Sequence, residues 1–232
     1  MPVAKTTVKQ QVYNLIFSDV LEGNFPLDEF ITEKQLMERY QAGKAPVREA
    51  LIELCSENIL HSIPRLGYQI IQVTEKNIAD ATELRLNLEL GALKRVQTNF
   101  TEGMLNRIST LNQNWWQDVL AGEMDLKSRW RHNSLFHATL ASFGGNELAV
   151  DVVRKMIQLE WRAYAQMLSQ PEQRDSFFQQ STDKPHLTIE RALAQGDFEQ
   201  AQEVLRQDIM TLPTWILKFG LFYSNKKPSF YL

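Results

Sequence analysis

Apolar residues recur every three or four positions along most of this chain, and that spacing predicts α-helix. The exception is the stretch 59–73, where two short runs rich in β-branched and aromatic residues flank the turn Pro64-Arg65-Leu66-Gly67. Two such runs around a Pro/Gly turn are typical of a β-hairpin. We therefore expect a mainly α protein that carries one small β-hairpin.

Length and composition narrow the class of protein further. A chain of 232 residues, 44% hydrophobic and 23% charged, fits one or two globular domains and excludes fibrous or wholly disordered chains. Cys55 is the single cysteine, which excludes an intrachain disulfide and a cysteine-rich metal site. No apolar run approaches the roughly 18 residues of a membrane helix, and the first residues do not resemble a secretory signal. We expect a soluble, cytoplasmic protein with no membrane partner.

The first 74 residues predict three helices followed by the hairpin. The first helix ends at Gly23, and the second begins at Thr32, which forms a capping box with Gln35 three residues on. The third begins near Pro46, since proline is tolerated where no helical N–H is needed. This order of elements is the layout of a winged helix–turn–helix, to which we assign residues 1–74.

From Thr74 onward the pattern is helical throughout. The spacing predicts helices over about 75–99, 101–120, 125–143, 147–168, 185–195 and 197–217. Helices without strands bury their apolar faces against one another. We therefore assign residues 75–232 to a second domain, an all-α helical bundle.

Cations at the helix–turn–helix and the hairpin tip form the first candidate site. Lys44 and Arg48 lie one turn apart at the start of the third helix, Lys34 starts the second, and Arg65 and Gly67 lie at the hairpin tip. A helix in the major groove reads base edges while nearby cations hold phosphates, and an arginine can enter the minor groove. The net charge is −3, so DNA binding would depend on local placement. From the residues alone, a small helical subdomain with solvated cations accounts for the pattern equally well.

A resemblance favours DNA binding. The run Pro46-Val47-Arg48-Glu49-Ala50-Leu51, followed by Leu54, Asn58-Ile59-Leu60 and the turn 64–67, resembles the winged-helix signature of the GntR superfamily of bacterial transcription regulators. The resemblance implies DNA contacts at Lys34, Lys44, Arg48, Arg65 and Gly67. Where the family usually has Val-Ser-Arg-Thr, this chain has Ala42-Gly43-Lys44-Ala45, so two hydroxyls and a bidentate guanidinium are missing. We expect a lower affinity or an unusual operator sequence.

Four polar residues of the predicted bundle form the second candidate site. His137 lies among apolar neighbours with Asn133 one turn before it, His186 opens a later helix, and Asp208 follows on the next. Four groups with lone pairs could coordinate a cation. A histidine among apolar residues is more often a hydrogen-bonded core residue, so this pattern leaves both interpretations open.

The second site also carries a resemblance. Arg85-x-x-x-Glu89, Phe136-His137 followed by Asn146, and His186 followed by Gly196-Asp197 and Ala201 are similar to the FCD effector domain of FadR-type GntR regulators. Many members bind a divalent metal at the positions of Asn133, His137, His186 and Asp208, through one Asp and three His. Here two His and one relocated carboxylate remain, a set suited to Zn, Ni, Mn or Fe(II). Alternatively the metal is lost and the polar residues bind an organic ligand directly.

The resemblance also implies an effector site that contains Arg85, Asn133, His137 and His186. The planar guanidinium of Arg85 could meet an anionic ligand, although the residue could equally pair with Glu89 on its own helix.

Taken together, these features predict a ligand-responsive transcription regulator. We expect a homodimer on a short inverted-repeat operator in double-stranded DNA, and the resemblance implies a small organic acid as effector. One alternative is a metal-dependent enzyme that uses His137, His186 and Asp208, but no catalytic sequence motif accompanies them. Another is a helical scaffold that has lost DNA binding.

Overall fold

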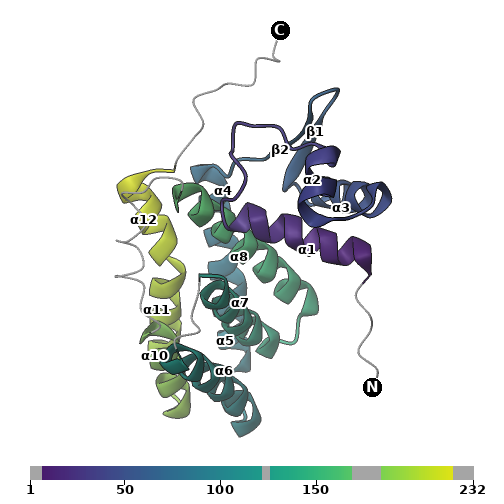
Figure 1. Ribbon diagram of the computed structural model, residues 1–232. Helices are drawn as coiled ribbons and strands as arrows, with labels where there is room; N and C mark the ends of the chain where they lie inside the picture. The colour runs from purple at the N-terminus through teal and green to yellow at the C-terminus, as the bar shows by residue number, and fades with distance from the viewer. Residues whose placement is uncertain (1–6, 122–125, 169–183, 222–232) are drawn as a thin grey trace. The chain divides into compact units, whose positions relative to one another are not determined.

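A computed structural model describes residues 7–121, 126–168 and 184–221 (Figure 1). By their internal contacts these residues divide into two compact units. The first unit contains residues 7–73 and 165–168, and the second contains 74–121, 126–164 and 184–221. None of the described helices combines the length and the apolar character needed to cross a membrane.

Residues 7–73 of the first unit form three helices and one antiparallel hairpin: α1 (Val8–Leu21), α2 (Glu33–Tyr40), α3 (Lys44–Ser56), β1 (Leu60–Ile63) and β2 (Gly67–Ile70). In the hairpin Leu60 lies opposite Ile70, and Ile63 lies opposite Gly67. The predicted winged helix–turn–helix order is confirmed.

Capping side chains explain where these helices begin. The Thr7 hydroxyl accepts a hydrogen bond from the Gln10 N–H, and Thr32 and Gln35 form the predicted capping box. Helix α3 begins at Lys44, two residues earlier than predicted. Pro46 therefore occupies the third helical position, where a backbone N–H still has no partner within the helix.

The core of the first unit lies between α1, α2, α3 and the hairpin. Its side chains form one buried cluster that includes Ile16, Leu36, Val47, Leu51, Leu54 and Leu60. A polar contact reinforces it: Asp19 of α1 accepts hydrogen bonds from Arg39 Nε (2.7 Å) and from the Tyr40 hydroxyl (2.5 Å) at the end of α2.

The second unit is entirely helical among its described residues. Its elements are α4 (Glu75–Arg85), the π-helical segment η1 (Leu86–Leu90), α5 (Gly91–Val96), α6 (Glu102–Ala121), α7 (Leu126–Phe143), α8 (Glu147–Leu168), α10 (Lys184–Ala194), α11 (Phe198–Ile209) and α12 (Thr211–Phe219). The last residues of α8 belong to the first unit.

Two of the predicted helices have features that apolar spacing did not predict. The helix over 75–99 includes the π-helical segment η1, and the helix over 197–217 is interrupted at Met210. Pro213 explains the interruption, because a proline has no N–H for the carbonyl four residues earlier and its ring collides with that carbonyl. The two halves are therefore α11 and α12.

A close approach of α5 and α7 positions the helices of the second candidate site. A Cβ atom at Gly144, directly after α7, would lie 2.9 Å from Ala92 Cβ of α5. Only glycine permits this spacing, and Arg95 of α5 donates a hydrogen bond to the Gly144 carbonyl (2.8 Å). Segment η1, which directly precedes α5, is thereby held against α7.

Candidate functional site

The cations predicted to bind DNA are exposed on the first unit. Lys34 lies in the first turn of α2, and Lys44 and Arg48 lie on the first two turns of α3. Arg48 Nε is 3.9 Å from Glu33 Oε1 at the start of α2. Both helices therefore present these side chains from their N-terminal ends.

The hairpin tip lies beside the start of α2. Gly67 has a φ of +123°, and a Cβ there would lie 2.5 Å from the Ile31 carbonyl oxygen, two residues before α2. Ile31 and Tyr68 form an antiparallel bridge with two backbone hydrogen bonds, of 2.7 and 2.8 Å. The start of α2 thus contacts both the hairpin and, through Glu33, the start of α3.

Arg65 occupies a strained position at the hairpin tip. Its φ is +69°, Pro64 precedes it, and the Leu66 N–H bonds to the Ile63 carbonyl (3.1 Å). Proline followed by a residue with positive φ is the pattern of a type II turn, in which that position favours glycine or asparagine. An exposed arginine in such a conformation is costly for folding alone and is a feature that recurs at functional sites.

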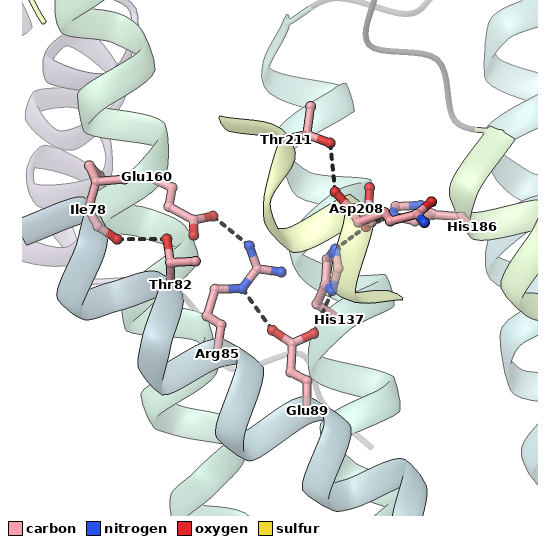
Figure 2. Close-up of polar contacts among 10 residues, drawn as sticks. Ile78, Thr82, Arg85, Glu89, His137, Glu160, His186, Asp208 and Thr211 are labelled. Atoms are coloured by element: carbon pink, nitrogen blue, oxygen red, sulfur yellow. Dashed lines mark hydrogen bonds and ion pairs between the residues drawn. The ribbon is translucent and has the colours of Figure 1, made fainter. Parts of the chain in front are cut away.

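In the second unit, three of the four predicted metal ligands converge. Asp208 Oδ2 of α11 lies 3.1 Å from His137 Nε2 of α7 and 3.4 Å from His186 Nε2 of α10 (Figure 2). One donor atom from each residue lies within 4.8 Å of the other two. The Phe136 ring stacks on the His186 ring at 3.8 Å between centroids, which fixes the plane of that imidazole.

A chain of buried ion pairs extends from His137 to α8. His137 Nδ1 lies 2.6 Å from Glu89 Oε2, Arg85 Nε donates to Glu89 Oε1 (2.7 Å), and Arg85 Nη1 donates to Glu160 Oε2 (2.6 Å). Figure 2 shows Arg85 between the two glutamates. Each of these four side chains is at most 3% exposed.

Burial and charge shift the pKa values within this chain. Burial alone would raise the pKa of Glu89, but the Arg85 guanidinium and the His137 imidazole hold it below its ordinary value. Burial raises the pKa of Glu160, and Arg85 offsets this only in part. Burial also opposes ionisation of Asp208, yet its contacts with the two imidazoles lower its pKa. Glu89 and Asp208 are therefore carboxylates at neutral pH.

Arg85 makes the predicted intrahelical pair with Glu89 and a second pair with Glu160. Its third nitrogen, Nη2, is buried without a hydrogen-bond partner among the described residues. An interaction of this nitrogen with an effector stays a prediction.

Asn133 is the predicted ligand that the structure does not link to the group. It is half-buried, and no hydrogen bond of its side chain occurs among the described residues. Its neighbour His132 lies beside His186: the two ring centroids are 5.6 Å apart, and the His132 ring is 4.7 Å from that of Trp115. Burial lowers the pKa of His132 to about 3, so this imidazole is neutral.

Glu160 and the role of Glu89 beside His137 were not predicted from the sequence. A signal for both is present, because each interrupts an apolar stripe of its helix. Glu160 lies between Ile157 and Tyr164, and Glu89 lies between Leu86 and Leu93. A charged residue inside an apolar stripe at helical spacing is buried, and a buried charge needs a partner.

Comparison with known proteins identifies both units. The sequence matches the family described as "Bacterial regulatory proteins, gntR family" over residues 8–70 and the FCD domain over residues 80–210. The HTH-type transcriptional repressor GlaR of Escherichia coli K12 is 25% identical over 206 residues, which cover 86% of this chain and 91% of that protein. The probable D-xylose utilization operon transcriptional repressor of Paenarthrobacter nicotinovorans is 31% identical over 97 residues, 42% of each chain.

Solved structures show the same fold. A GntR transcriptional regulator from Rhodococcus sp. RHA1 superposes with a TM-score of 0.68 at 17% identity, over 90% of this chain and 97% of the other. Escherichia coli McbR/YncC superposes with a TM-score of 0.65 at 20% identity, over 90% and 98%. The matches do not favour a metal-dependent enzyme or a scaffold without DNA binding. The chain belongs to the gntR family of bacterial regulatory proteins, as a DNA-binding transcription regulator that joins a winged helix–turn–helix to an FCD domain.

Proposed function

We propose that this protein is a ligand-responsive repressor that acts in the cytoplasm on a short inverted-repeat operator. Residues 1–74 form its DNA-binding domain, and residues 75–232 bind the effector and hold two copies together. The named relatives GlaR and the probable D-xylose operon regulator are repressors, which supports the direction of control. Two-fold symmetry would place two copies of α3 about 34 Å apart on successive major grooves.

The exposure of the cations at the α3 N-terminus and the hairpin tip carries the DNA-binding part of this proposal. Arg48 and Lys44 would contact base edges or phosphates at the major groove. Arg65 and Gly67 would approach the minor groove, and Lys34 would bind a phosphate. All four cations are exposed, and none forms a buried ion pair with another residue that the structure describes, so each of them can exchange water for DNA.

A mobility-shift assay with the promoter region that flanks the protein's own gene tests this role. We expect Arg48→Ala to lose binding by at least about tenfold, because one direct base contact contributes about 1–3 kcal/mol per chain. Circular dichroism would verify that the variant folds. Arg154→Ala on the exposed face of α8 is the matched control and should bind as the unchanged protein does. Equal binding by both variants would refute the assigned reading helix.

We further propose that His137, His186 and Asp208 hold one divalent cation, with Zn, Ni and Mn as the candidates. Two ligand atoms about 2.1 Å from a tetrahedral metal are about 3.4 Å apart, close to the 3.1 and 3.4 Å observed. If Glu89 accepts the Nδ1 proton of His137, the Nε2 lone pair faces an oxygen of Asp208. Two acceptors at 3.1 Å need a cation or a proton between them, so these residues fit a metal.

The metal, when bound, would supply a Lewis acid to which a carboxylate effector can attach. The chain's own residues set the geometry: Glu89 orients His137, as hydrogen-bonded carboxylates do for metal-binding histidines, and Phe136 orients His186. Arg85 Nη2, which is buried and has no hydrogen-bond partner within residues 7–121, 126–168 and 184–221, is a candidate donor to the anionic effector. Asn133, one turn from His137, remains a candidate fourth ligand or effector contact.

A further inference from the structure

The buried side chain of Gln166 hydrogen-bonds to the main chain of Val73, where the chain passes from the first unit into α4. Gln166, near the end of α8, accepts a hydrogen bond from the Val73 N–H (2.9 Å) and donates one to the Val73 carbonyl (3.1 Å), across 93 residues of sequence. Gln166 is 4% exposed and Val73 is 1% exposed. Since buried backbone groups need partners, these two bonds hold the main chain at Val73 against α8.

The same two segments of chain are joined again inside the second unit. Thr74 caps α4 directly after Val73, and Arg85 at the end of α4 pairs with Glu160 of α8. Glu160 precedes Gln166 by six residues, about 9 Å along a helix. The Val73–Gln166 contact therefore lies within the first unit and the Arg85–Glu160 contact within the second, and α8 contributes one residue to each.

The second tie leads directly to the candidate metal group. Arg85 also pairs with Glu89, Glu89 contacts His137, and His137 contacts Asp208 (Figure 2). Breaking a buried ion pair leaves an uncompensated charge. A substitution of His137 therefore changes the balance of charge at Glu89 and Arg85. Because Arg85 of α4 also pairs with Glu160 of α8, the change affects both helices.

We propose that Gln166 is the positioning residue through which the state of the His137–His186–Asp208 group sets the affinity of the winged helix–turn–helix for DNA. The hydrogen bonds of Gln166 that the structure describes both go to the main chain of Val73. Gln166 holds Val73, the last residue before α4, from the end of α8, the helix that also carries Glu160. The inference rests on the proposed function and supplies its regulation, as a coupling free energy between two sites.

A double-mutant cycle on operator affinity tests the proposal. Fluorescence anisotropy with the promoter fragment would give the Kd of the metal-free unchanged protein, of His137→Gln, of Gln166→Met and of the double variant. We expect His137→Gln to change the Kd at least about fivefold in the unchanged background, and less than about twofold in the Gln166→Met background. Gln158→Met, at an exposed glutamine of the same helix, should leave the fivefold change intact.

Two outcomes of this cycle overturn the proposal. One is an equal effect of His137→Gln in both backgrounds, and the other is no effect of His137→Gln in the unchanged protein. If Gln166→Met fails to fold, Gln166→Glu, which keeps an acceptor for the Val73 N–H, replaces it, and the same loss of coupling is expected.

Hydrogen exchange separates this inference from the proposed function, because it needs no DNA. His137→Gln should change the protection of backbone amides 68–73, and Gln166→Met should abolish that response. A normal response in a protein that does not bind the promoter fragment would refute the proposed function alone. Normal DNA binding with no response in the amides would refute the role of Gln166 alone.

Discussion

Charged side chains of unequal number meet around His137. Glu89, Glu160 and Asp208 contribute three carboxyl groups, and Arg85, which pairs with both glutamates, is the one permanent cation of the group among the described residues. Burial opposes a charge on His137, but Glu89 and Asp208 raise the pKa of this imidazole, so a proton on it can supply a second positive charge. An uncompensated charge is costly in a buried site. The raised pKa of Glu160, caused by burial, has the effect of reducing the negative charge. A divalent cation bound to His137 would supply positive charge in place of that imidazole proton.

This group of carboxylates and imidazoles predicts metal binding that depends on Asp208. We expect tag-free protein, treated with EDTA and then exposed to Zn²⁺, to retain close to one equivalent after desalting. Asp208→Asn should retain less than about a tenth of an equivalent, because an amide oxygen is a far weaker ligand than a carboxylate. His61→Gln removes an exposed histidine of β1 and should retain as much metal as the unchanged protein. Equal metal content in the Asp208→Asn protein would exclude the site.

At the scale of elements, local chemistry made the first unit predictable. Thr32 and Gln35 identify the start of α2, and the Pro64–Gly67 turn identifies the hairpin, because each depends on neighbours within four residues. The partners of Glu89 and Glu160 were not predictable in this way. They depend on which helices pack together, and Glu160 lies 75 residues from Arg85. The spacing of apolar residues likewise does not predict the π-helical segment η1, because a π-helix differs from an α-helix in its backbone hydrogen bonds and has no distinct composition.

The contact between α1 and α2 makes a prediction about acid stability. Burial alone would raise the pKa of Asp19, but hydrogen bonds from Tyr40, Asn24 and Arg39 lower it. A folded-state pKa below the unfolded value adds stability that is present above the unfolded pKa and is lost as pH falls through the folded pKa. Asp19→Asn should therefore destabilise the protein at pH 7 by about 1–2 kcal/mol and should flatten its acid denaturation.

Urea denaturation of the unchanged and Asp19→Asn proteins at pH 7 and pH 3, followed by circular dichroism, measures this difference. Glu29→Gln is the matched control, since Glu29 is an exposed carboxylate of the same unit. A loss of stability that is as large at pH 3 as at pH 7 would show that Asp19 does not act through its charge.

At the scale of the whole molecule, a net charge of −3 must be reconciled with binding to a polyanion. The first 74 residues contain seven Lys and Arg against nine Asp and Glu. The net charge of the DNA-binding unit is therefore negative and does not attract DNA. The charge composition alone argues against DNA binding. The order of the helices and the hairpin, together with the family match, supports DNA binding. Affinity must then come from a few phosphate contacts made by well-placed cations.

With so few contacts, the salt dependence of binding reports both the number of phosphates that the protein neutralises and the number of copies bound to one operator. Each neutralised phosphate contributes about −0.9 to the slope of log K against log salt concentration. Lys34, Lys44, Arg48 and Arg65 on two copies would give a slope no steeper than about −7. Lys34→Ala should reduce its magnitude by about 2 if two copies bind one operator, and by about 1 if one copy binds.

Lys76→Ala, at an exposed lysine of α4 paired with Asp80, is the control and should leave the slope unchanged. An unchanged slope in Lys34→Ala would remove that residue from the interface, and a reduction of about 1 would contradict the proposed dimer.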